Sequence, residues 1–259
     1  MRIIDAHTHI GLTEFIVRPL SPEKLLKPAF QDKMSQTCDE FLGSLRLNGV
    51  EKAVVFPFPL AEADADKANS YVLNAWESHK DRIIPFALLD NDPLKWVALG
   101  FRGFKQHFLL EPERFDSKRI YREIAATGMP LMAHFPTRAI VEHAERILAV
   151  APDIKLIIAH IGRCEPFTGK CVMENIAGLK KYGNVYFETS TVRDIPTFRA
   201  VLAEVGASRL CFGSDIPFGS KKGPNPQGDE LEILLQAVSD EKDRVQVFSG
   251  TILKLVGEV

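Results

Sequence analysis

An apolar run near the start of the chain, residues 2–6, leads directly into His7-Thr8-His9. Side chains alternate between the two faces of a β-strand, so His7 and His9 are expected to project from the same face. Neutral imidazoles are common ligands of divalent metal ions. The pair alone is weak support for a metal site, because short patterns arise by chance and two hydrogen-bonded histidines would look the same.

Further reactive side chains follow later apolar runs. They are Lys105 and His107 in the run 103–107, His134 at the end of 130–134, His160 at the end of 155–160, and Asp215 shortly after 209–213. Five of the seven histidines therefore fall at the ends of predicted strands, whereas His79 and His143 fall within helical patterns. This distribution favours a shared metal site over scattered structural histidines.

Apolar, β-branched runs alternate with helical patterns along the whole chain. The predicted strands are 2–6, 53–58, 83–88, 103–107, 130–134, 155–160, 185–188 and 209–213. The predicted helices are 40–47 with Asp39 as N-cap, 61–79, 93–100, 118–126 with Asp116 or Ser117 as N-cap, 138–150, 170–182, 195–205, 229–238 and 242–256. Eight such units in 259 residues predict a single-domain (β/α)8 barrel over residues 1–259. A doubly wound open sheet is the alternative, but no glycine-rich turn follows the first strand.

The barrel prediction also locates the site, because the carboxyl ends of barrel strands meet at one face and carry the catalytic groups. The longest irregular stretch, 11–37, contains three prolines, and a loop of this length in a compact domain is often a functional lid. A second loop, 217–227, follows the last strand.

Composition argues against several classes of protein. A net charge of −2 and the absence of a basic run argue against a nucleic-acid partner, and no apolar stretch is long enough for a membrane span. The four cysteines form no Cys-x-x-Cys pair, which argues against a cysteine zinc site. The first ten residues lack the features of a signal peptide, so a cytoplasmic protein with reduced thiols is expected.

The order and spacing of these motifs resemble the amidohydrolase superfamily. The matching motifs are Asp5-Ala6-His7-Thr8-His9, Gly103-Phe104-Lys105-Gln106-His107, Ala133-His134, Ala159-His160-Ile161-Gly162 and Gly213-Ser214-Asp215-Ile216-Pro217. They are most similar to the amidohydrolase-related (amidohydrolase 2) branch, which includes metal-dependent lactonases and decarboxylases. The resemblance extends from the first predicted strand to the eighth.

The resemblance implies roles for individual residues. His7, His9, His134 and Asp215 would bind a divalent metal, most simply zinc, with manganese or another divalent ion as the alternative. Asp215 would also act on the metal-bound water as a catalytic group, and His160 would be a catalytic general acid–base group or a second ligand. Lys105, His107 and Arg163 would bind the substrate.

Some of these roles have open alternatives. Lys105 pairs with a substrate carboxylate, or it is carboxylated and bridges two metals. Arg163 clamps a substrate carboxylate, or it is a solvated loop residue. Asp5 and Glu188 either support the site or form structural hydrogen bonds.

Three functions fit this set of residues. The first is a metal-dependent hydrolase of a small carboxylate, lactone or amide. The second is a metal-dependent decarboxylase of an aromatic or unsaturated carboxylic acid, which would use nearly the same ligands. The third is a non-catalytic metal-binding barrel. The expected partner is a small-molecule substrate, and the apolar segments 15–20 and 25–30 could form a homodimer contact.

Overall fold

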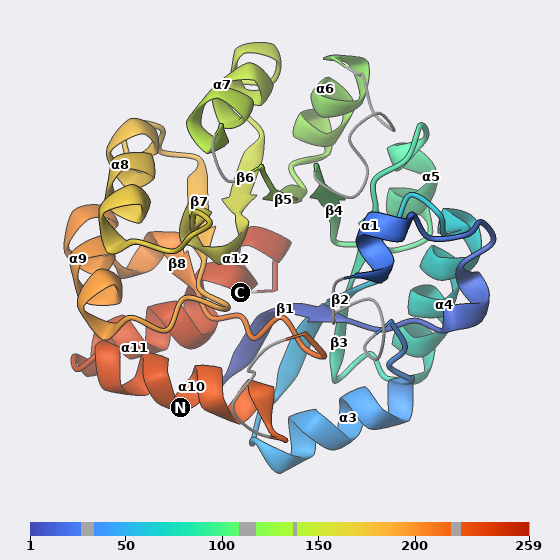
Figure 1. Ribbon diagram of the computed structural model, residues 1–259, viewed down its shortest axis with the longest axis horizontal. Coiled ribbons are helices and arrows are strands. Elements are labelled where there is room, and N and C mark those ends of the chain that lie inside the picture. Colours follow the sequence, from blue (N-terminus) through green and yellow to red (C-terminus); the bar gives the residue numbers. More distant parts are fainter. Residues whose placement is uncertain (27–33, 109–117, 137–138, 219–223, 259) are drawn as a thin grey trace.

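The computed structural model describes residues 1–26, 34–108, 118–136, 139–218 and 224–258. Within these ranges eight parallel strands follow one another around one sheet in chain order (Figure 1). The strands are β1 (Ile4–His9), β2 (Lys52–Phe56), β3 (Ile83–Leu88), β4 (Gly103–His107), β5 (Pro130–His134), β6 (Lys155–Ile158), β7 (Val185–Glu188) and β8 (Leu210–Cys211). The backbone N–H groups of Ala6 and His9 donate to the carbonyls of Phe212 and Ile216, at 2.7 and 2.9 Å. These bonds join β1 to the segment that follows β8 and close the barrel. The predicted (β/α)8 barrel is confirmed.

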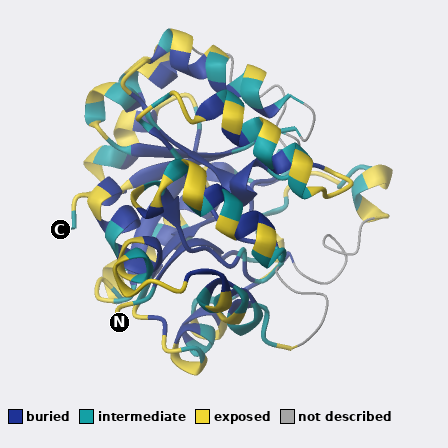
Figure 2. Ribbon diagram, turned by 90° about the vertical axis from the view of Figure 1, so that its left-hand side faces the viewer, coloured by how far each residue is buried: buried dark blue, intermediate teal, exposed yellow. Residues whose placement is uncertain are grey.

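The helices form a ring around the strands (Figure 1). They are α1 (Pro22–Leu25), α3 (Cys38–Leu47), α4 (Ala65–Ser78), α5 (Pro93–Ala98), α6 (Lys118–Thr127), α7 (Ile140–Val150), α8 (Gly169–Leu179), α9 (Ile195–Val205), α10 (Pro226–Ala237), α11 (Glu241–Val245) and α12 (Thr251–Val256), with short helical turns η1 (Thr13–Phe15), η2 (Ala159–Gly162), η3 (Ala207–Arg209) and η4 (Gln246–Gly250). Figure 2 shows buried strands inside and exposed residues on the outer faces of the helices. This amphipathic pattern is why the helical periods could be recognised.

Several predicted helices are shifted at their ends, such as 61–79, 170–182 and 229–238, and two further predictions are corrected. Thr37, not Asp39, is the N-cap of α3, because its hydroxyl accepts from the backbone of Glu40 while the Glu40 carboxylate accepts from the backbone of Thr37. The single helix predicted over 242–256 is divided into α11, the π-helical turn η4 and α12. The Val247 carbonyl accepts a hydrogen bond from the Phe212 backbone at 2.9 Å, and this contact with the β8 segment accompanies the widened turn. Asp116 and Ser117, the predicted caps of α6, lie outside the described residues.

Strand ends also differ from the prediction where the site lies. β1 continues to His9, so both histidines lie within the strand rather than after it. β6 ends at Ile158, and His160 lies in the turn η2. β8 comprises only Leu210 and Cys211, because the chain leaves regular sheet before Asp215.

The loop predicted as a lid is closed at its base. Gly11 and Gln36 exchange two backbone hydrogen bonds of 2.9 Å, and the Gln36 amide donates to the His9 carbonyl at 2.7 Å. The loop is not wholly irregular, since it contains η1 and α1. The second apolar segment proposed for a dimer contact extends into residues 27–30, which lie outside the described ranges.

One end of the barrel is closed by α12. Apolar side chains from this helix join one buried cluster with residues that line the barrel, namely Ile4, Ala6, Val54, Phe56, Ile84, Phe86, Met132, Ile157, Ala159 and Cys211. Lys52, the first residue of β2, forms an ion pair of 2.8 Å with Glu258. Lys155, the first residue of β6, donates to the Leu255 carbonyl at 3.4 Å. The C-terminal helix therefore covers the amino ends of the strands, opposite the predicted site.

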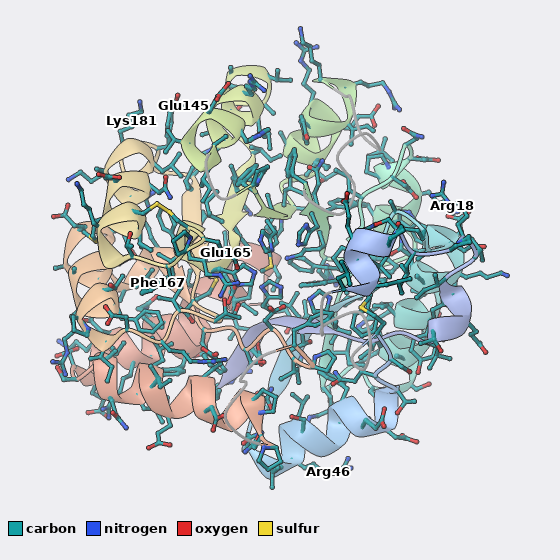
Figure 3. All side chains as sticks on the ribbon, viewed as in Figure 1. Arg18, Arg46, Glu145, Glu165, Phe167 and Lys181 are labelled. Atoms are coloured by element: carbon teal, nitrogen blue, oxygen red, sulfur yellow. A yellow bond between two sulfur atoms is a disulfide. The ribbon has the colours of Figure 1, made fainter. Side chains whose placement is uncertain are left out.

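The expectation of reduced thiols is wrong for one pair. Cys164 and Cys171 form a disulfide with a Cα–Cα distance of 6.3 Å, while Cys38 and Cys211 are free. The pair was missed because the two cysteines are seven positions apart and are brought together by the turn before α8. Figure 3 shows the bond beside this helix, with Glu165 and Phe167 on the intervening loop. None of the helices in the described ranges combines the length and the apolar character needed to cross a bilayer.

Candidate metal centre

β1 supplies His7 and His9, whose imidazole centroids lie 5.3 Å apart. The pairing register of β1 with β2 shifts between Asp5 and Thr8, which places an irregularity at His7, whereas His9 is paired with Phe56. Both side chains are buried. Sequence alternation predicted that these imidazoles share one face, and the structure brings them to the same carboxylate.

That carboxylate is Asp215. Its Oδ1 lies 3.2 Å from Nε2 of His7 and 3.1 Å from Nε2 of His9. The Asp215 backbone has a φ of 60°, and its N–H donates to the His7 carbonyl at 2.8 Å. This left-handed conformation is unfavourable for a non-glycine residue, so the bond to β1 helps to hold the carboxylate in place.

His160, His134 and His107 form a series of neighbouring imidazoles that begins beside His7, with the His160 and His7 ring centroids 5.1 Å apart. His160 has a φ of 58°, and its Nε2 lies 3.1 Å from Nδ1 of His134. His107 and His134 are paired residues of β4 and β5, and their ring centroids are 4.0 Å apart. The donor atoms of His7, His160 and Asp215 all lie within 4.8 Å of one another. The side chains predicted from five different strand ends thus meet in one place.

The outward-facing nitrogens of these imidazoles contact other groups. Nδ1 of His7 lies 2.6 Å from Oε2 of Glu188, and Nδ1 of His9 lies 3.3 Å from the Pro57 carbonyl. Nδ1 of His160 lies 2.8 Å from the Ser190 hydroxyl. Such contacts fix ring orientation and leave Nε2 to face the centre, which is the usual arrangement around metal-binding histidines. The donor set and its supports therefore fit a divalent ion.

Burial determines the charge of most of these groups. It lowers the pKa of His9 to about 4, although the bond to Asp215 opposes this, and it lowers the pKa of His160 to about 3. Burial alone would raise the pKa of Asp215, but the neighbouring His7 brings it well below the usual range. At neutral pH His9 and His160 are therefore neutral and Asp215 is ionised. Burial and Lys105 oppose protonation of His7, but Glu188 and Asp215 raise its pKa, so a metal ion would compete with a proton at this imidazole.

The three predicted substrate-binding residues differ in their surroundings. Lys105 is fully buried, with its Nζ 3.1 Å from Nε2 of His7 and 4.8 Å from the Phe56 ring centroid. Burial lowers the pKa of Lys105 to about 8. His107 lies against His134. Arg163 lies further out on the loop after η2, where its guanidinium donates to the Thr191 carbonyl at 3.4 Å and to Glu165 at 3.2 Å.

An aromatic wall lies beside His9. The Phe58 ring is stacked on the His9 imidazole with a centroid distance of 5.5 Å, and Phe218 meets His9 edge-on at 5.2 Å. Phe56 packs against the same imidazole at 4.6 Å. The wall excludes solvent from one side of the centre and strengthens its electrostatic interactions.

Asp5 and Glu188 are the two carboxylates for which the sequence allowed either a supporting role at the site or a structural one. Asp5 accepts from the backbones of His7 and Ser214, each at 3.0 Å, and does not contact the His7 imidazole. Its remaining oxygen accepts from the Ser214 hydroxyl and the Gln227 amide, so it joins β1 to the segment that carries Asp215. Glu188 contacts the His7 imidazole directly, and its position at the end of a predicted strand was the available signal.

Comparisons with known proteins agree with this geometry. A family model described as Amidohydrolase matches residues 4–257. None of the curated proteins matches the chain in sequence.

Several solved structures share the fold. A probable 2-pyrone-4,6-dicarboxylic acid hydrolase from Acinetobacter baumannii has a TM-score of 0.78 at 18% identity, covering 99% of this chain and 100% of its own. A 2,6-dihydroxybenzoate decarboxylase has a TM-score of 0.73 at 17% identity, covering 99% of each chain. A 5-carboxyvanillate decarboxylase from Sphingomonas paucimobilis has a TM-score of 0.70 at 14% identity, again covering 99% of each chain. These similarities concern the fold.

Proposed function

Because the chain belongs to the amidohydrolase family, we propose that it is a metal-dependent hydrolase of a small carboxylate, lactone or amide. The observation that carries the proposal is the convergence of Nε2 of His7, Nε2 of His9 and Oδ1 of Asp215, with separations of 3.1 and 3.2 Å. Ligand atoms about 2 Å from a zinc ion lie at about these distances from one another. A nitrogen and oxygen donor set suits zinc, and manganese is the alternative.

In this proposal His7, His9 and Asp215 hold the ion, and His134 or His160 fills a further position. His134 belongs to the ligand set predicted from the sequence, whereas His160 is one of the three residues with donor atoms within 4.8 Å of one another. When bound, the ion would polarise the substrate carbonyl and lower the pKa of an attacking water. The remaining histidine is then available for proton transfer.

The chain's own residues would move the protons. Asp215 takes a proton from the attacking water and returns it to the leaving group, because its carboxylate is ionised and faces the same centre as the histidines. Lys105 carries positive charge close to this centre and would attract a substrate carboxylate. His107 and Arg163 would contact the substrate further from the reacting bond.

Decarboxylation is the second candidate, and the two decarboxylases of similar fold favour keeping it. In that reaction the substrate carboxylate leaves as carbon dioxide and the ring carbon is protonated. Lys105 again suits the substrate, since its ammonium would pair with the carboxylate. The two reactions differ in their product rather than in the residues they need.

The test combines metal analysis with a product assay. Purified protein loaded with zinc or manganese is given 2-pyrone-4,6-dicarboxylic acid, 2,6-dihydroxybenzoate and 5-carboxyvanillate, while ring opening and carbon dioxide release are measured in parallel. We expect ring opening, and its loss together with the bound metal in His7→Ala. Carbon dioxide release without ring opening would favour the second candidate. Wild-type metal content and activity in His7→Ala would contradict the ligand assignment.

A further inference from the structure

We propose that Glu188 is a positioning residue that accepts the Nδ1 proton of His7 and the backbone N–H of His160. It thereby leaves the lone pair of the neutral His7 imidazole on Nε2, where it can bind the metal, and anchors the turn that carries His160. The proposal deepens the proposed function and rests on it, because His7 needs an unprotonated Nε2 only if it binds an ion.

The Glu188 carboxylate is fully buried and surrounded by donors. Oε1 accepts from the Ser190 backbone, and Oε2 accepts from the His160 backbone at 3.2 Å. Backbone N–H groups can only donate, so each carboxylate oxygen serves as an acceptor. These donors favour the ionised carboxylate, which can only accept hydrogen bonds.

The contact to His7 follows from this. Oε2 of Glu188 lies 2.6 Å from Nδ1 of His7, and an oxygen that accepts requires the proton to reside on Nδ1. With a proton on Nδ1, Nε2 of the neutral imidazole bears a lone pair. Nε2 of His7 faces Oδ1 of Asp215 at 3.2 Å. Both atoms belong to the proposed ligand set of the ion.

The contact to His160 acts on the backbone as well as on the ring. His160 has a left-handed φ of 58°, and its N–H is tied to Glu188. The Ser190 hydroxyl donates to Oε2 of Glu188 at 3.0 Å, so its oxygen can accept from Nδ1 of His160 at 2.8 Å. The Ser190 carbonyl is a second contact of the same nitrogen at 3.3 Å. One carboxylate on β7 therefore supports histidines from β1 and from the turn after β6.

The segment that follows β8 leaves room for this carboxylate. A Cβ at Gly213 would press into Oε1 of Glu188 and would lie 2.8 Å from Cβ of His7. Glycine at this position lets the segment after β8 approach both side chains. The Glu188–His7 contact is thus built into the packing of three strands.

Glu188→Gln tests the proposal with almost no change of volume. The amide nitrogen can only donate, so it cannot accept from His7 or from the backbone of His160. If it replaces Oε2, His7 must present a lone pair at Nδ1, and its proton moves to Nε2. Glu230→Gln is the matched control, because Glu230 is also buried but contacts the Thr191 backbone and Arg193 rather than a histidine.

The direct readout is proton NMR of the full chain labelled with 15N-histidine, with and without zinc. In the wild type and in Glu230→Gln we expect a downfield proton on Nδ1 of His7, as a hydrogen bond of 2.6 Å to a carboxylate produces. In Glu188→Gln this signal should disappear, while the Nδ1 proton of His160 persists because the Ser190 carbonyl still accepts it. A wild-type His7 with its proton only on Nε2 would overturn the proposal, even if Glu188→Gln did not fold.

Zinc affinity is the second readout, measured by competition with a chromophoric chelator. We expect about 10–100-fold weaker binding in a folded Glu188→Gln variant and an unchanged affinity in Glu230→Gln. Unchanged zinc affinity together with a retained His7 signal in Glu188→Gln would refute the positioning role. Failure of the wild type to bind zinc or manganese would instead refute the proposed function, and the NMR signal would still decide whether Glu188 holds His7.

Discussion

The two ends of the barrel are built from the same eight strands but have opposite character. At the amino ends, side chains such as Ile4, Val54 and Ile157 pack with α12 into an apolar cluster. At the carboxyl ends, buried imidazoles and carboxylates contact one another. The difference teaches that one end supplies packing energy and the other supplies reactive groups at a cost in stability.

Backbone conformation shows the same contrast. The non-glycine residues with left-handed φ in the described ranges are His160, Ile161, Thr191 and Asp215, and all follow the carboxyl ends of β6, β7 or β8. Each such residue costs about 1–2 kcal/mol relative to an ordinary conformation. Strain of this kind persists only where surrounding contacts hold it, as the bonds of His160 and Asp215 to neighbouring strands do.

The largest expected effect comes from removing a charge at the carboxyl end. Asp215→Asn should lower kcat/KM by about 1,000-fold or more, because the variant loses both a metal ligand and a proton acceptor. Steady-state kinetics and metal content measure the loss. Asp66→Asn, the same change at an exposed position, is the control and should alter neither quantity. Comparable activity in Asp215→Asn and Asp66→Asn would contradict the assignment of catalysis to the carboxyl ends of the strands.

The opposite experiment removes packing at the amino end. Ile252→Ala on α12 should lower the free energy of unfolding by about 2–5 kcal/mol, because it leaves a cavity in a fully buried cluster. Urea titration measures this, and kcat at a temperature where the variant is folded should stay close to that of the wild type. Leu47→Ala, at a position with 73% exposure, should change stability little. A large fall in kcat for Ile252→Ala would show that the two ends are not independent.

The disulfide adds covalent stability beside the carboxyl end. The bond joins cysteines with a sequence separation of 7, and closure of a loop of this length predicts a loss of about 2–3 kcal/mol in Cys164→Ser/Cys171→Ser, since the unfolded chain is no longer constrained. Urea titration with and without a dithiol reductant measures this loss. The reductant should bring the wild type to the stability of the double variant and leave that variant unchanged. If the reductant is shown to free both thiols but leaves the stability of the wild type unchanged, the disulfide does not contribute to stability.

The smallest expected effect is the dependence of stability on pH through Glu230. Burial raises the pKa of Glu230 from 4.5 to about 7, although Arg193 opposes the shift. The folded protein therefore keeps a proton that the unfolded chain has lost, and stability falls as pH rises from about 4.5 to about 7. Between pH 5 and 6 the wild type should lose about 1 kcal/mol more than Glu230→Gln. An equal pH dependence in both proteins, or one of opposite sign, would contradict the pKa.

The sequence was most informative where a local pattern reflects a local structure. Alternating apolar runs and helical periods predicted all eight strands, and the bounds of β3, β4, β5, β7 and α9 agree with the prediction. Other boundaries were shifted, as in β2 (Lys52–Phe56, predicted as 53–58), and some were wrong because a distant segment alters the backbone. Examples are the turn at His160, which is held by Glu188, and the division of the last helix, where Val247 contacts Phe212.

By itself the sequence determined the barrel and the set of reactive side chains at its carboxyl end, because strand alternation and strand order are sufficient to predict which residues face that end. Only the tertiary structure decided which atoms meet. The contact of Glu188 with His7 spans 181 positions, and that of His9 with Asp215 spans 206. The pairing of Cys164 with Cys171 likewise depends on the path of a turn. Such contacts are set by barrel closure and by left-handed residues at the strand ends, which leave no periodic pattern in the sequence.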